Sequence, residues 1–193
     1  AKDWTMCASI DGTGPIGEFI RTGHKWDQWD RNFREGVALP GGHDKMIMDL
    51  TITGPGMFDL KNFLDYALEL DVKIETKRMF AFHPDIVLSP MAWPRHILDE
   101  IVHDVLDYAR PIVTDKQQTL IRELEGMLTA PTFQEQFPDT ANEQFFNGRA
   151  YQQIIHNIRK DGENGRLTLG DIYRQHPELW LWFSRPDPKH NQR

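Results

Sequence analysis

The sequence is poor in three features, and each shortage narrows the kinds of protein that it can encode. It has a single cysteine, Cys7, which excludes an internal disulfide and fits a reducing compartment. It has neither an apolar run of the roughly 18 residues that span a bilayer nor a signal-peptide pattern, so we expect no membrane partner and a cytoplasmic location. Lys and Arg total 22 against 29 Asp and Glu, giving a formal net charge of -7. Because phosphate neutralisation requires a basic face, nucleic acid is not an expected partner.

The composition otherwise fits a globular protein with a sizeable core, since 39% of the residues are hydrophobic and 11% aromatic. The pattern of apolar residues predicts strands over 4–10, 46–53 and 72–82. Between the first two strands it predicts helical segments over 15–35, separated near Gly23, and a loop over 39–43. An amphipathic helix with an apolar face from Leu60 to Leu68 is expected before the third strand. This alternation of strands and helices indicates βα units with a parallel sheet.

The alternation stops after Pro84, and the rest of the chain is predicted to be helical. Proline and glycine clusters divide this part into segments. Helices are expected over 94–109, 114–128, 142–160 and 168–183. The polar tail over 185–193 is expected to be disordered.

The most informative segment follows the first predicted strand. It reads Ser9-Ile10-Asp11-Gly12, and from Glu18 to Trp26 it continues as Glu-Phe-Ile-Arg-Thr-Gly-His-Lys-Trp. This pattern resembles the twitch-domain branch of the radical S-adenosylmethionine (SAM) enzymes. In that branch the fourth barrel strand ends in Ser-x-Asp-Gly, and a helix reading roughly Glu-Tyr-Ile-Arg-x-Gly-x-x-Trp follows. The resemblance extends over residues 1 to about 112.

The resemblance implies an α/β fold in which residues 1–112 form three βα units, the carboxyl-terminal half of a partial (β/α)6 barrel. A helical extension over 113–184 would follow. In the family, a Cys-x-x-x-Cys-x-x-Cys loop and a Gly-Gly-Glu-Pro strand precede this point, and neither occurs in these 193 residues. We therefore expect the other half of the barrel to come from a preceding segment or a partner protein. The chain alone is expected to be catalytically inactive.

As the resemblance implies, the complete protein would cleave SAM at a [4Fe-4S] cluster and abstract hydrogen from a substrate. The sequence does not identify that substrate, which is a peptide or a small molecule. An iron–sulfur cluster is usually held by several cysteines, so Cys7 alone cannot hold it. No cysteine follows Cys7, so an auxiliary cluster would also need ligands from elsewhere.

The resemblance assigns cofactor binding to three residues: Ser9 and Asp11 beside the ribose of SAM, and Arg21 in the helix that follows. A carboxylate with a neighbouring hydroxyl suits a ribose diol. The ordinary alternatives are that Asp11 caps the following helix, that Ser9 satisfies a backbone group and that Arg21 ties helix to sheet. Thr51 and Thr53, at the end of the next strand, fall in the same region, although Thr is common in strands.

Three other interpretations stay open. Gly12-x-Gly14-x-x-Gly17 matches a dinucleotide-binding pattern between a strand and a helix, but the next strand ends in Thr51-Ile52-Thr53-Gly54 without the expected acidic residue. His96, Asp99, His103 and Asp107 share one helix face, which could bind a metal but is also the solvent side of an apolar stripe. Finally, a half barrel could serve as a non-catalytic interaction module. An unpaired first strand then predicts an aggregation-prone isolated chain.

Overall fold

The sheet consists of three parallel strands in the order β1-β2-β3, within a computed structural model that describes residues 4–79, 86–159 and 167–188. The strands are β1 (Met6–Ile10), β2 (Met46–Ile52) and β3 (Lys73–Arg78). The prediction of a mixed α/β fold with a parallel sheet is confirmed, and the described part of the sheet is open. The third strand ends at Arg78 and not at Phe82, and residues 80–85 lie outside the described residues.

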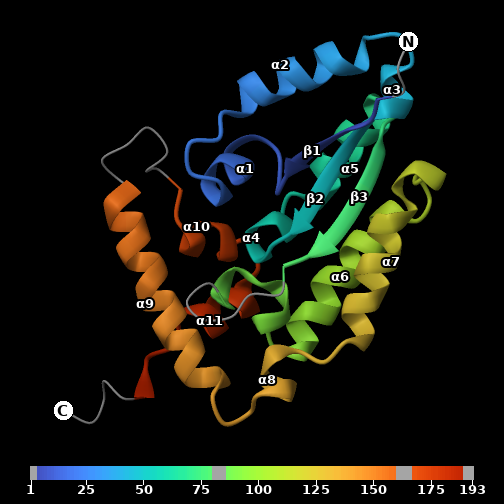
Figure 1. The fold of residues 1–193 in the computed structure, drawn as a ribbon. Helices are drawn as coiled ribbons and strands as arrows, with labels where there is room; N and C mark the ends of the chain where they lie inside the picture. The colour runs from blue at the N-terminus through green and yellow to red at the C-terminus, as the bar shows by residue number, and fades with distance from the viewer. Residues whose placement is uncertain (1–3, 80–85, 160–166, 189–193) are drawn as a thin grey trace.

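Helices connect the strands and fill most of the remaining chain (Figure 1). The segments between strands are α1 (Gly14–Ile20), α2 (Trp26–Val37), α3 (Gly42–Lys45), α4 (Gly54–Met57) and α5 (Leu60–Glu69). The later ones are η1 (Ile86–Leu88), η2 (Pro90–Ala92), α6 (Arg95–Ala109), η3 (Asp115–Gln117), α7 (Gln118–Thr129), α8 (Phe133–Gln136), α9 (Ala141–Arg159), α10 (Leu169–Tyr173) and α11 (Pro177–Ser184).

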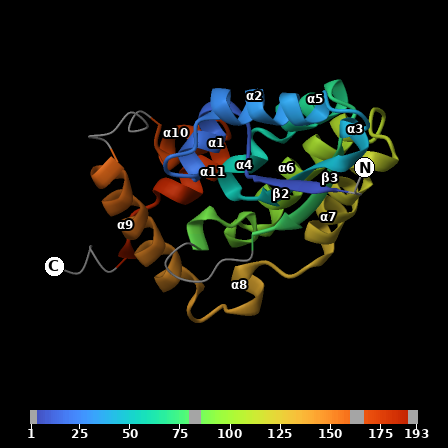
Figure 2. The same ribbon diagram turned by 45° about the horizontal axis from the view of Figure 1, so that its top comes forward.

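One face of the sheet is packed in the core. Along β2 the side chains alternate, so Met46, Met48, Leu50 and Ile52 are all buried, as expected for a strand with one covered face. In Figure 1 the helices α5 and α6 lie behind the strands, and Figure 2 shows α2 and α5 on the same side of the sheet. The helices between the strands therefore cover this apolar face.

The opposite face of the sheet is polar and accessible. The strand register places Ser9 opposite Asp49, and Asp49 opposite Glu75, so these three side chains form a row on that face. Lys77 pairs in register with Thr51 in the next row. Each of these residues is exposed or half-buried. Within the described residues, this face thus carries mainly charged and hydroxyl groups, with Cys7 and Ile47 in the row before Ser9 and Asp49.

The outer edge of β3 is closed by side chains that precede and begin α7. Gln117 Nε2 donates to the carbonyl of Val72 at 2.8 Å, and Thr119 Oγ1 donates to the carbonyl of Ile74. Lys116 Nζ donates to the carbonyl of Asp71 at 2.7 Å. Gln117 is fully buried, so its amide satisfies a carbonyl at the start of this edge that water cannot reach. The sheet therefore ends at β3.

The structure corrects the prediction for the last helical segment. Residues 168–183 form two helices, because Pro177 occupies the first turn of α11 and His176 caps it by accepting a hydrogen bond from the Leu179 amide. The predicted loop over 39–43 also contains the start of the short helix α3.

The start of the predicted tail is attached to the body of the protein. Arg149 Nη1 donates to the carbonyl of Arg185 at 2.7 Å, and Arg185 itself donates to the carbonyl of Trp182. These contacts hold the chain where it leaves α11. Residues 189–193 lie outside the described residues.

Gly17 allows α1 to pack tightly against the turn that precedes it. A Cβ atom added to Gly17 would lie 2.2 Å from the carbonyl oxygen of Gly12, which is a backbone clash. A Cβ added to Gly126 in α7 would instead meet only the end of the Arg78 side chain, at 3.2 Å. Both glycines lie within helices, but only Gly17 is required by its surroundings.

We expect Gly17→Ala to destabilise the protein by about 1–3 kcal/mol, because the turn must move to admit the methyl group. The matched variant Gly126→Ala should leave stability unchanged or raise it by up to about 1 kcal/mol, since alanine is the better helix former. Urea unfolding followed by circular dichroism measures both free energies. Equal stability of the two variants would contradict the tight packing of α1.

Candidate functional site

The candidate site is a cavity of about 380 Å³ at the carboxyl ends of the strands. Ligands of open parallel sheets commonly bind at this end, where the loops after the strands converge. One wall comes from the strand ends and α1, and the opposite wall comes from α9. The cavity is lined by Asp11, Phe19, Ile20, Thr51, Thr53, Met79, Leu88, Tyr151, Gln152, Ile155 and Arg159.

Asp11 and Arg21 form an ion pair at the wall of the cavity. Arg21 Nε donates to one carboxylate oxygen of Asp11, and Arg21 Nη2 lies 3.3 Å from the other. The Asp11 side chain is 9% exposed and that of Arg21 is 40% exposed. The hydrogen bond to Asp11 raises the pKa of Arg21 above its ordinary value, so the guanidinium stays charged. The pair fixes a buried carboxylate that faces the cavity.

The ion pair continues into a polar network across the open face of the sheet. Arg21 Nη2 donates to Ser9 Oγ at 3.2 Å, and Ser9 Oγ donates to Asp49 at 3.3 Å. Lys77 Nζ donates to both Asp49 oxygens at 2.8 Å. The structure thus brings together Ser9, Asp11 and Arg21, the three residues predicted as a site, and connects them with two residues that the sequence did not indicate.

The ordinary alternatives for Asp11 and Ser9 are wrong. Thr13 and not Asp11 occupies the position before α1, and the Thr13 side chain makes no capping hydrogen bond. Ser9 bonds the side chains of Arg21 and Asp49. Arg21 does tie α1 to the sheet, through Asp11. Asp11, which follows β1, is therefore oriented by Arg21, which follows α1.

The two threonines after β2 have different roles. Thr53 is buried and caps α4, since its hydroxyl accepts a hydrogen bond from the Gly56 amide at 3.0 Å. Thr51 is half-buried on the open face of the sheet. Both residues line the cavity, but the Thr51 hydroxyl, unlike that of Thr53, does not cap a helix. Thr51 is therefore the better candidate for a ligand contact.

The wall formed by α9 was not foreseen from the sequence. Tyr151, Ile155 and Arg159 face the cavity from one side of this helix, at spacings of four residues. Arg159 Nη1 donates to the carbonyl of Phe19 at 3.0 Å, which joins the end of α9 to α1. The spacing indicates a shared helix face. Nothing in the local pattern, however, shows that this face covers the strand ends.

The glycine pattern is engaged in packing, which argues against a phosphate site at this turn. Asp59, which is buried before α5, accepts a hydrogen bond from the Thr13 amide and another from the Thr13 hydroxyl, whose oxygen lies 3.0 and 2.8 Å from the two carboxylate oxygens. A carboxylate of the chain itself thus occupies the amino-terminal end of α1, where a dinucleotide would place its phosphates. Gly12 and Gly17 are needed for the close approach of helix and turn.

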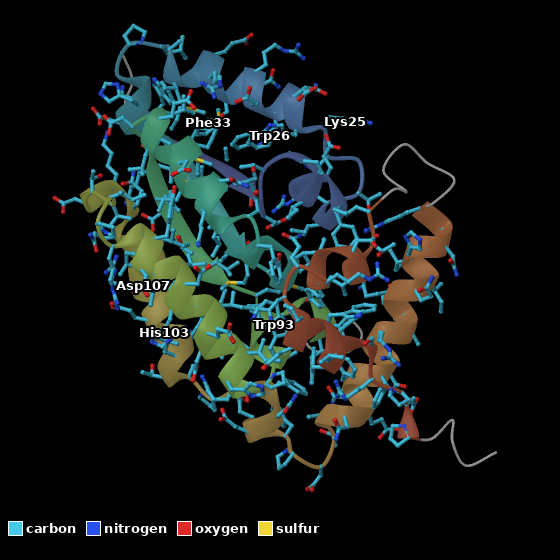
Figure 3. All side chains as sticks on the ribbon, turned by 180° about the vertical axis from the view of Figure 1, so that it is seen from behind. Lys25, Trp26, Phe33, Trp93, His103 and Asp107 are labelled. Atoms are coloured by element: carbon cyan, nitrogen blue, oxygen red, sulfur yellow. The ribbon has the colours of Figure 1, made fainter. Side chains whose placement is uncertain are left out.

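The histidines and aspartates of α6 form a solvent-exposed face. Figure 3 shows His103 and Asp107 on the outer side of that helix, and both are exposed. In the part of the chain that the structure describes, no group of three or more His, Cys, Asp or Glu side chains is arranged to hold a metal ion. None of the described helices has both the length and the apolar character needed to cross a membrane.

Comparisons of the chain with protein-family profiles, with curated proteins and with solved structures found no match. The resemblance to radical SAM enzymes therefore depends on the residues themselves and stays a prediction.

The pH dependence of stability tests whether the buried Asp59 carboxyl holds the turn after β1. Burial raises the pKa of this carboxyl above its ordinary value of 3.8, and the hydrogen bonds from Thr13 and Asn62 offset only part of the shift. The folded state therefore binds the proton more tightly than the unfolded state. The contribution of Asp59 to stability is fully present below pH 3.8 and is lost as the pH rises through the higher folded-state pKa.

We expect the stability of Asp59→Asn, relative to the native protein, to increase as the pH rises from about 3.8 through this window and to level off above it. Unfolding free energies measured from pH 3 to pH 7 test this expectation. The exposed Asp107→Asn serves as the control and should show no such trend. A difference between Asp59→Asn and the native protein that is independent of pH would refute the assignment.

Proposed function

We propose that residues 1–112 are the carboxyl-terminal half of a radical SAM barrel, and that the cavity beside Asp11 holds the nucleoside of SAM in the completed protein. The observation that carries the proposal is the joint position of Ser9 and Asp11. The resemblance assigns both to the cofactor, and both lie in one network at the carboxyl end of the sheet.

The cavity has the chemistry that a nucleoside requires. Its polar side offers the Asp11 carboxylate and the Thr51 hydroxyl, which can accept hydrogen bonds from the two ribose hydroxyls. Its apolar side offers Phe19, Ile20 and Ile155, against which a flat base can pack. Arg21 holds the Asp11 carboxylate in place before the ligand arrives, which reduces the cost of ordering it on binding.

These residues fit a nucleoside, but they do not fit an iron–sulfur cluster. Cys7 is the sole cysteine of the sequence and is exposed on the strand that begins the sheet. Several thiolates usually hold an iron–sulfur cluster, so its ligands would have to come from another polypeptide segment. We derive no reaction step through the cluster. The role proposed for these residues is to bind and orient the nucleoside.

The completed polypeptide provides the test of this function. DNA sequencing upstream of the codon for Ala1 identifies the natural polypeptide, and an in-frame Cys-x-x-x-Cys-x-x-Cys and Gly-Gly-Glu-Pro are expected. After anaerobic reconstitution with iron and sulfide, that polypeptide should release 5′-deoxyadenosine from SAM on reduction by dithionite. The 193-residue chain alone should release none. A natural polypeptide or natural complex that releases no 5′-deoxyadenosine would exclude the proposed activity.

The role of Asp11 is tested by binding. We expect Asp11→Asn in the completed protein to weaken SAM binding roughly tenfold to a hundredfold, because a hydrogen bond to a charged group contributes about 1.5–3 kcal/mol. Isothermal titration measures the affinity, and thermal unfolding checks that the variant is folded. Asp107→Asn, on the exposed face of α6, is the matched control and should bind SAM normally. Equal affinities of the two variants would remove Asp11 from the site.

A further inference from the structure

A second cavity, larger than the candidate site, lies along α9, and we call it the α9 groove. It has a volume of about 860 Å³ and is lined by residues of α9, α10 and α11 (Figure 1). Its apolar lining includes Phe146, Leu169, Trp180 and Phe183. On α9 the lining runs from Phe146 to His156, a distance of about 15 Å along a helix axis. An extended segment of about five residues matches this length.

The α9 groove is basic, although the chain as a whole has a net charge of -7. Arg149 and Arg174 line it, and the carboxylate of Asp187 is the acidic group among its described lining residues. Arg174 pairs with Asp171 through Nη1, and its guanidinium lies 4.3 Å from the ring centre of Trp180. A positive groove on a negative protein favours an anionic ligand.

Arg149 is held in the groove by neutral partners. Its Nη1 donates to the carbonyls of Phe183 and Arg185, both at 2.7 Å, and its guanidinium lies 5.0 Å from the ring centre of Phe146. Burial lowers the pKa of Arg149 below its ordinary value, and the attraction of Asp187 offsets only part of this shift. An anion bound in the groove would supply the compensating charge.

Amide side chains give the groove partners for a peptide backbone. Asn147 and Gln153 line it from α9, and both are exposed. A carboxamide donates and accepts hydrogen bonds, as a peptide group does. Apolar side chains of a peptide can pack on the aromatic lining. Nucleic acid fits less well, because each of its units is charged and Asp139 and Glu143, in the adjoining cavity, would repel the phosphates.

We propose that the α9 groove binds an acidic peptide segment in an extended conformation, with its carboxylates on Arg149 and Arg174. The groove adjoins the candidate site, because Gln152 of α9 lines both cavities. A peptide in the groove therefore lies beside the cavity that would hold the nucleoside. The further step, that this peptide is the substrate, rests on the proposed function.

A selection for binding peptides tests the proposal. The natural polypeptide that contains these residues is immobilised and exposed to random heptapeptides displayed on phage. We expect the selected peptides to be enriched about twofold or more in Asp and Glu, because the groove is basic. The affinity of the selected peptide, measured by fluorescence anisotropy, should fall as salt rises from about 0.05 to 0.5 M. Enrichment of neutral or basic peptides, or no enrichment, would overturn the proposal.

Two double variants localise the binding. Gln153→Glu with Arg174→Gln lowers the charge of the groove by two, and the new carboxylate lies one helical turn from Arg149, with which it can pair. We expect the affinity to fall about tenfold. Gln118→Glu with Arg122→Gln makes the same exchange on α7, at the other side of the molecule in Figure 1, and should leave the affinity unchanged.

All four substituted side chains are exposed, so both double variants should melt like the native protein. Equal affinities of the two double variants would place the peptide elsewhere and overturn the proposal. A single-stranded oligonucleotide that displaces the peptide and binds more tightly would also overturn it.

This result is independent of the activity test. Peptide binding in the groove by a protein that releases no 5′-deoxyadenosine would retain the groove and reject the proposed function. Release of 5′-deoxyadenosine without peptide binding would do the reverse.

Discussion

The parallel direction of the strands is the constraint on which the rest of the structure depends. Parallel strands require crossovers, and the crossovers place helices on the apolar face of the sheet. The same arrangement brings all three carboxyl ends to one edge, where Asp11, Thr51 and Met79 meet at the cavity. It also leaves the second face without cover from the chain's own connections. The polar face, the open edge and the cavity at the strand ends thus all follow from the parallel direction of the strands.

Two carboxylates, Asp59 and Asp11, hold the turn after β1 in place, and they lie in different environments. Asp59 is buried and accepts hydrogen bonds from Thr13, so it fixes the start of α1 from the side of α5. Asp11 faces the cavity and is held by Arg21, the residue that follows α1. The turn is therefore anchored at both ends. Its glycines permit the close approach that this anchoring requires, which explains a glycine-rich pattern without a bound phosphate.

Local patterns predicted the three strands and most of the helices, whereas the assignment of Ser9, Asp11 and Arg21 to one site came from the resemblance and stays a prediction. Alternation along β2 and the first-turn prolines of α1 and α11 are signals within a few residues. Pro177 likewise marks the boundary between α10 and α11. Other features have no local signal, because their partners are distant in the chain. The bond from Arg159 to Phe19 spans 140 residues, and the closure of the β3 edge by Gln117 spans 45. Such contacts follow from tertiary packing.

The polar network on the open face contributes little to the stability of the chain. The side chains of Lys77 and Asp49 are 56% and 28% exposed, and ion pairs in such positions are usually worth less than about 1 kcal/mol. Their interaction would strengthen if a further polypeptide covered the face and excluded water, because the effective dielectric constant would fall. The same covering would enclose the Asp11 carboxylate and the cavity beside it. The strength of the pair between Lys77 and Asp49 therefore depends on whether this face is covered.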